Sequence, residues 1–135
     1  MSVIKPKRGE CKLEVLTKAR ELAVYTIKIT SNENVFLKEY QEAITSDLVK
    51  CAKDIFIHSF EANNVNLNAD PEIRRKLMDQ AIRDCYNLLA LMQIAKPVFH
   101  LSAKRIRYWG NLTVEVRDLI RKWKKSDINR LANKL

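Results

Sequence analysis

The residues best suited to chemistry are cations near the C-terminus, and the chemistry they suit is phosphate binding. Four of them share one stripe at helical spacing and four flank it: Arg107, Arg117, Arg121 and Lys124, flanked by Lys104, Arg105, Lys122 and Lys125. Within this segment only Glu115 and Asp118 offset them, whereas an ordinary solvated helix face pairs its cations with carboxylates four residues away. Because unpartnered cations suit contacts with phosphates, we predict that these eight residues bind nucleic acid.

Two aromatic residues lie among these cations. Tyr108 falls off the apolar stripe, so that it can either stack on a base or pack on the flank of the bundle or at an interface. Trp123, within "RKWKKSD" (121–127), continues the apolar stripe of the same segment. We therefore predict that Trp123 is buried and anchors the cations around it.

Patterns typical of an enzyme or a metal site do not occur. His58 and His100 fall in no HExxH or paired-carboxylate motif, and two isolated glycines cannot form a phosphate-binding loop. The three cysteines, Cys11, Cys51 and Cys85, are widely spaced and form no ligand pair. We expect structural histidines, two core cysteines (Cys51 and Cys85), a reduced intracellular protein, and no catalytic residue, metal or cofactor.

Length and composition predict a single all-α domain. The chain has 135 residues, of which 47% are hydrophobic and 30% charged, with only two glycines and three prolines. Sheets need many turns, and the shortage of turn-forming residues favours a few long helices. The start "MSVIKPKRGE" has no signal-peptide pattern, and no apolar run is long enough to span a membrane. We expect a cytoplasmic protein without a membrane partner.

The periodicity predicts four helices, over 13–32, over 38–63, from the Asp70-Pro71-Glu72 cap to about Pro97, and over 103–125 after a Ser102 cap. Residues 35–37 should fold back as a hydrophobic plug. Short connections predict an antiparallel up-down-up-down four-helix bundle. The predicted apolar stripes include Leu13, Ile27, Tyr40, Ile44, Ile73, Leu88, Trp109 and Trp123.

The positive charge is concentrated at the two ends of the chain. The net charge of +9 divides into +3 over residues 1–12, −1 over 13–102 and +7 over 103–135. An up-down topology would bring the N-terminal arm (Lys5, Lys7, Arg8 and Lys12) beside the C-terminal tail (126–135). Segregated charge of this kind indicates a polyanionic partner.

Three stretches carry a resemblance to a known family. "ELAVYTIKITSNENVF" (21–36), "AIRDCYNLLALMQIAKPVFHLSAKRIRYW" (81–109) and "LIRKWKKSD" (119–127), with the asparagine-rich turn, resemble the Avd-like four-helix-bundle proteins. These are accessory variability determinants of diversity-generating retroelements, and they are similar to proteins of 23S rRNA intervening sequences. The resemblance covers about residues 13–128 and departs at Leu37 and Gln41, where relatives often carry proline and a basic residue.

The resemblance implies a role. Avd-like proteins form barrel-like homopentamers, associate with a reverse transcriptase and with RNA or DNA, and support mutagenic retrohoming without catalysing a reaction. The alternative is a protein-interaction bundle of the rRNA intervening-sequence type with no retroelement role, whose basic face would meet an acidic protein.

Overall fold

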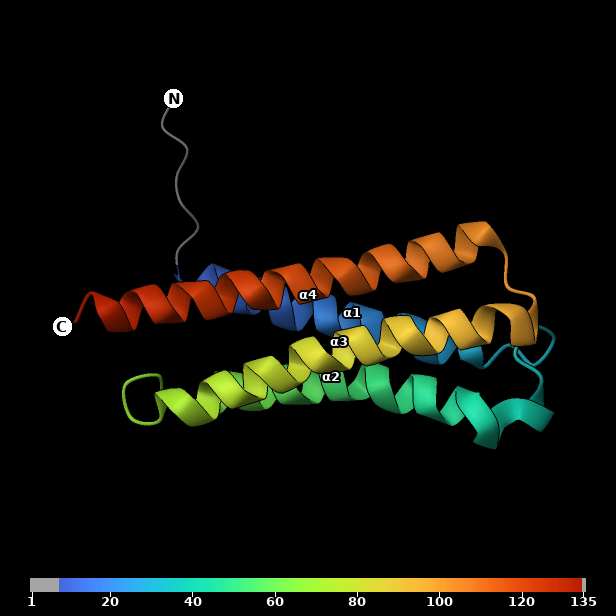
Figure 1. The fold of residues 1–135 in the computed structure, drawn as a ribbon, viewed down its shortest axis with the longest axis horizontal. Helices are drawn as coiled ribbons and strands as arrows, with labels where there is room; N and C mark the ends of the chain where they lie inside the picture. Colours follow the sequence, from blue (N-terminus) through green and yellow to red (C-terminus); the bar gives the residue numbers. More distant parts are fainter. Residues whose placement is uncertain (1–7, 135) are drawn as a thin grey trace, which may run out of the picture.

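The computed structural model describes residues 8–134, and within that range the chain is all-α. Four α-helices follow one another: α1 (Arg8–Thr30), α2 (Ser46–Asn64), α3 (Pro71–Phe99) and α4 (Ala103–Ala132) (Figure 1). The predicted all-α four-helix class is confirmed. None of the described helices is apolar enough over a sufficient length to cross a membrane.

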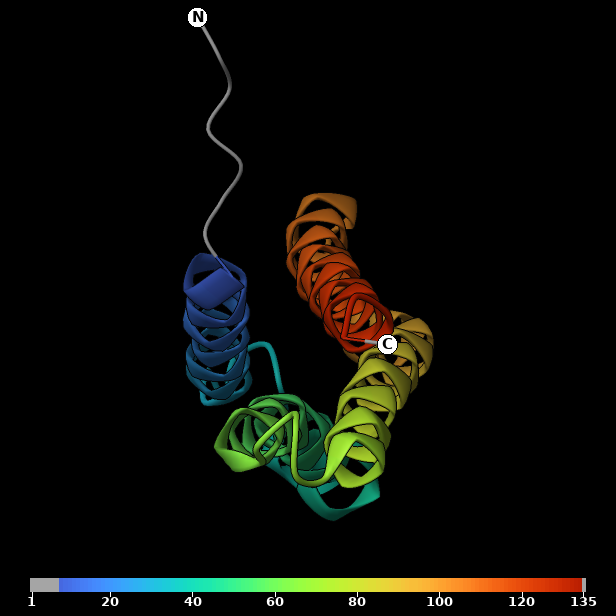
Figure 2. The ribbon, with the colours of Figure 1, turned by 90° about the vertical axis from the view of Figure 1, so that its left-hand side faces the viewer.

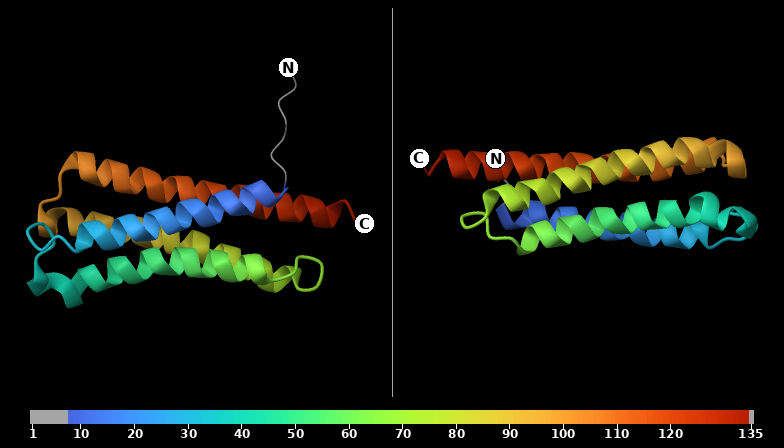
Figure 3. Two further views of the ribbon diagram at one scale, coloured as in Figure 1. Left: turned by 180° about the vertical axis from the view of Figure 1, so that it is seen from behind. Right: turned by 60° about the horizontal axis from the view of Figure 1, so that its bottom comes forward.

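The four helices occupy the corners of a bundle seen end-on (Figure 2). α1 packs against α2 and α4, and α3 packs against the same two helices. Neighbouring helices run in opposite directions (Figure 3), so that the end of α1 meets the start of α4, where Trp109 bonds Thr26. Of the predicted basic arm, Lys5, Lys7 and the side chain of Arg8 lie outside the described residues.

The core contains the large side chains that the apolar stripes predict. Trp109 is fully buried and Trp123 is 2% exposed, so the predicted burial of Trp123 is confirmed. Of the plug predicted over 35–37, Phe36 is buried whereas Leu37 is 42% exposed. The ring centroid of Phe36 lies 4.7 Å from that of Phe99 and 6.3 Å from that of Trp109. One end of the bundle is therefore closed by aromatic contacts.

Some residues assigned to the stripes are not buried. Leu13, Ile27 and Ile73 are 62%, 41% and 53% exposed, and Tyr40 is also exposed. The prediction was wrong here because each helix turns a narrower face to the core than its apolar residues cover. In α1 that face is made by Val15, Ala19, Leu22 and Thr26.

The second predicted helix does not begin as a regular α-helix. A 3₁₀ turn (Lys38–Tyr40) and a π-helical segment (Gln41–Thr45) precede α2. The residues up to Ala43 are exposed, and Ile44 and Thr45 are the first buried ones. The wider π turn accommodates the change from the surface to the core.

Proline does not end the third helix, which was expected to stop at about Pro97. α3 includes Pro97 and continues to Phe99, and His100 closes it in the left-handed conformation at φ 53°. Phe99 is buried against Phe36, and this packing holds the last turn against the bias that proline imposes on the preceding residue. α3 begins at Pro71 as predicted, but the Asp70 side chain makes no cap hydrogen bond. The Ser102 cap of α4 is as predicted, with Ser102 Oγ accepting a bond from the Arg105 N–H.

The fourth helix is longer than expected. It continues from residue 125 to Ala132, so most of the predicted tail is helical. Asp127 is buried there and accepts from Arg74 of α3, over 2.7 Å from Nε to Oδ2 and 3.2 Å from Nη2 to Oδ1. Arg74 also donates to the Val65 carbonyl over 3.0 Å. This pair closes the second end of the bundle and joins α4 to the α2–α3 loop.

Candidate nucleic-acid interface on the fourth helix

The buried stripe of α4 determines which of its cations face outward. Because Trp109, Val116 and Trp123 face the core, residues about half a turn away point to solvent. Four cations occupy that side, and all four are exposed: Lys104, Arg107, Lys122 and Lys125. We call these four residues the outer basic face.

The cations of the outer basic face lack partners in the part of the chain that the structure describes. No described carboxylate lies within the 4.0 Å limit of an ion pair with any of them, nor with the half-buried Arg105. Of the two acidic residues expected to offset them, Glu115 pairs with Lys18 of α1 at 3.7 Å and Asp118 pairs with Arg117 at 3.1 Å. These positive charges therefore remain available to a ligand.

Two other cations of the predicted stripe, Arg117 and Lys124, have carboxylate partners, which corrects the expectation that they lack them. Lys124 Nζ lies 2.5 Å from Asp79 Oδ1, across the contact with α3. Arg117 pairs with Asp118 at 3.1 Å. Asp79 is remote in the sequence, so this partner becomes apparent only from the register of α3 against α4.

Tyr86 of α3 organises two of the arginines and was not among the predicted site residues. The guanidinium carbons of Arg117 and Arg121 lie 5.3 and 5.5 Å from the centroid of its ring. Arg121 Nη2 also donates a hydrogen bond to the Tyr86 hydroxyl. Cation–π contact of this kind fixes long side chains without removing their charge. Arg121 is thus held in place on the border of the outer basic face.

A shallow groove extends the interface toward the end of α4. It has a volume of about 270 Å³ and is lined by Lys122, Lys125, Ser126, Asn129, Arg130 and Asn133. Arg130 reaches Asp127 at 3.8 Å, while Asn129 and Asn133 are exposed. Ammonium and amide donors around one hollow suit the oxygens of a phosphate.

Tyr108 lies on the opposite flank of α4, beside α1. It is 54% exposed, and its ring centroid is 4.9 Å from that of Tyr25 with the planes tilted by 58°. It thus packs on the flank of the bundle and still presents much of its ring to solvent. Packing on the flank of the bundle and stacking on a base, the two alternatives for Tyr108, are therefore compatible.

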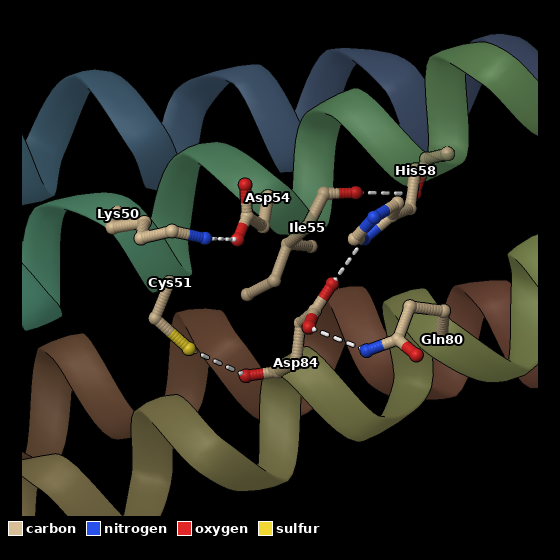
Figure 4. Close-up of polar contacts among 8 residues, drawn as sticks. Lys50, Cys51, Asp54, Ile55, His58, Gln80 and Asp84 are labelled. Carbon is tan, nitrogen blue, oxygen red and sulfur yellow. Dashed lines mark hydrogen bonds and ion pairs between the residues drawn. The ribbon is translucent and has the colours of Figure 1, made fainter.

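A separate polar cluster connects α2 and α3. His58 Nδ1 lies 2.5 Å from Asp84 Oδ2, and Gln80 donates to Asp84 Oδ1 over 3.1 Å. The Cys51 thiol donates to the Asp84 backbone carbonyl over 3.1 Å, and Figure 4 shows these side chains converging between the two helices. His58 therefore has a carboxylate partner, supplied by another helix and absent from its sequence neighbourhood.

This cluster lacks an activated nucleophile. Burial, together with the negative charge of Asp84, raises the pKa of the Cys51 thiol to about 12. Burial likewise raises the pKa of Cys85 to about 12, and a reactive cysteine needs the opposite shift. Among the described residues no group of three or more His, Cys, Asp or Glu side chains is placed to hold a metal ion. The geometry fits a buried hydrogen-bonded link between α2 and α3.

Comparison of the chain with protein-family models, with curated proteins and with solved structures finds no match.

Proposed function

We propose that this chain is a non-enzymatic accessory protein of a diversity-generating retroelement, which binds RNA or cDNA and the reverse transcriptase that copies it. The proposal that the chain binds nucleic acid rests on the outer basic face, whose four cations are exposed without a described carboxylate partner: Lys104, Arg107, Lys122 and Lys125. The retroelement part depends on the family resemblance of residues 13–128.

Binding would act through the backbone of the nucleic acid. The four cations stand as one pair near each end of the segment 104–125, and since a helix rises about 1.5 Å per residue, the two pairs can contact phosphates well apart along one strand. Neutralising those phosphates releases counterions and gives an affinity that falls steeply with salt. Arg121, held over Tyr86, adds a positioned guanidinium at the border. Such a surface retains template and cDNA near the polymerase, and the chemistry belongs to the polymerase.

We further propose that the protein acts as a cytoplasmic homo-oligomer, with a pentamer as the expected form. Two large exposed apolar side chains on α2, Ile57 and Phe60, support an assembly contact. α2 and α4 lie at opposite corners of the bundle (Figure 2). An assembly that buries α2 would leave the outer basic face in solution and would keep the positive faces of neighbouring subunits apart.

The deciding experiment measures how nucleic-acid affinity depends on salt. The test variant replaces Lys104, Arg107, Lys122 and Lys125 with alanine. The control variant removes the same charge elsewhere, at the exposed Lys38, Lys53, Lys76 and Lys96. The test variant should have a slope of log K against log salt that is shallower by about 3, at about 0.7–0.9 per lost contact. An equal change in both variants would show that net charge, rather than the outer basic face, governs binding.

A second candidate is a protein-interaction bundle of the intervening-sequence type. The exposed pair Ile57 and Phe60 favours it, since the 42% and 49% exposure of these large side chains is costly without a partner. Affinity capture from cells with and without nuclease separates the two functions. Retention of an acidic protein after nuclease treatment favours this candidate, whereas recovery of a reverse transcriptase with RNA favours the first.

A further inference from the structure

A groove between α1 and α4 carries an exposed aromatic surface away from the outer basic face. It has a volume of about 470 Å³, and its walls include Arg20, Val24, Tyr25 and Lys28 of α1 and Tyr108 of α4. Tyr108 is the most exposed tyrosine of the described chain, at 54%. An aromatic ring that is open to solvent on a charged groove requires an explanation beyond core packing.

The two tyrosines are held rigidly. Tyr25 supports Tyr108 at a centroid distance of 4.9 Å. The residue after each of them forms a buried cross-helix bond, in which Trp109 Nε1 donates to Thr26 Oγ1 over 3.0 Å. Burial raises the pKa of the Tyr25 hydroxyl, against the opposing effect of the nearby Arg105 charge. The tyrosine pair is therefore a preformed platform with a cation beside it.

The electrostatics of the groove favour an anion. Arg20 and Lys28 on its wall are exposed, and no described carboxylate lies within 4.0 Å of their charged groups. The acidic residue on the wall, Glu21, is already engaged by Lys18 at 3.5 Å. An occupant that offers both a flat aromatic surface and negative charge complements this groove.

We propose that the groove binds single-stranded nucleic acid, with one base stacked on Tyr108 and the adjoining phosphates on Arg20 and Lys28. Stacking on aromatic side chains is the usual device of sequence-tolerant single-strand binding. A duplex keeps its bases stacked on each other and offers only phosphates, which the outer basic face can take. This inference rests on the proposed function and adds to it a second contact that distinguishes a single strand from a duplex.

The experiment uses the full chain with a short single-stranded oligonucleotide containing 2-aminopurine and with a duplex of the same length. Wild type and Tyr108→Phe should quench the fluorescence of the probe on binding. Tyr108→Leu, which keeps apolar bulk and lacks the ring, should bind the single strand about 5- to 100-fold more weakly. Its affinity for the duplex should not change. Tyr40→Ala, at an exposed tyrosine packed edge-on against Phe99, is the matched control and should behave as wild type.

The outcomes separate the two proposals. If Tyr108→Leu retains wild-type affinity and quenching for the single strand, the groove is not the stacking site, and the salt-dependent binding by the outer basic face still stands. If wild type binds neither the single strand nor the duplex, both proposals fall. If Tyr108→Leu loses its helical circular dichroism, the double variant Arg20→Ala/Lys28→Ala is tested instead. An unchanged affinity of that double variant for the single strand overturns the inference.

Discussion

Trp109 Nε1 donates a hydrogen bond to Thr26 Oγ1 over 3.0 Å, inside the contact between α1 and α4. Both residues are fully buried, and Thr26 in turn donates to the Leu22 carbonyl over 2.8 Å. Thr26→Val keeps the shape of the side chain but leaves the indole N–H without an acceptor. We expect a loss of about 1–3 kcal/mol in the free energy of unfolding, measured by urea denaturation.

Thr113→Val provides the control for that prediction. Thr113 is also fully buried and donates to a carbonyl one turn back, that of Trp109, over 2.9 Å. It accepts no bond from a buried donor among the described residues, so its replacement should cost clearly less. Equal losses in the two variants would show that the cross-helix bond adds nothing.

The buried pair of Arg74 and Asp127 gives a second prediction. Asp127→Ala leaves the 5% exposed Arg74 without its carboxylate, which should cost about 3–5 kcal/mol of stability. The double variant Arg74→Met/Asp127→Leu removes both charges and should recover much of that loss, as read by thermal and urea unfolding. A double variant less stable than Asp127→Ala would contradict this account.

Asp79 gives a prediction of tighter binding. Its carboxylate neutralises Lys124 at 2.5 Å, so Asp79→Asn should free a cation at the border of the outer basic face. We expect a higher affinity for RNA and a steeper dependence on salt, measured by fluorescence anisotropy. Asp47→Asn, at an exposed carboxylate on α2, is the control with the same change in charge. A similar gain in this control would attribute the effect to net charge alone.

Replacing Gly110 with alanine should stabilise the folded chain. Apart from its chain neighbours and the nearby backbone of its own helix, a Cβ placed there meets no described atom within 4 Å. Gly110→Ala in the middle of α4 should therefore stabilise the monomer by about 0.5–1 kcal/mol, because alanine loses less backbone entropy in a helix. The measurement is urea unfolding at low protein concentration. If the same variant weakens self-association in sedimentation, Gly110 lies where another subunit approaches closely.

The cysteines give a prediction about reactivity and pH. Since burial raises the pKa of Cys51 and Cys85 to about 12, both thiols stay protonated near neutral pH. In a Cys11→Ser background, native protein should react far more slowly with iodoacetamide at pH 8 than unfolded protein. Stability should fall as the pH rises from about 9 toward 12, because the unfolded chain releases these protons first. Fast labelling of folded protein would contradict the prediction.

The sequence predicted the features that depend on one helix at a time. The burial of Trp109, Trp123 and Phe36, the start of α3 at Pro71 and the Ser102 cap all follow from local periodicity and local backbone preferences. What it did not predict depends on two helices together. Asp79 beside Lys124, Tyr86 beneath Arg121 and Asp84 beside His58 each join residues at least 26 positions apart, and only the register of packed helices brings them into contact.

The two ends of the bundle differ chemically, and each has its own natural fluorophore. Trp109 lies among Phe36 and Phe99 at the aromatic end, whereas Trp123 lies beneath the Arg74 guanidinium at 5.0 Å, at the ionic end. The chain has two tryptophans in all. Replacing either one with phenylalanine leaves a single emitter, so that the melting of each end can be followed separately without an added dye.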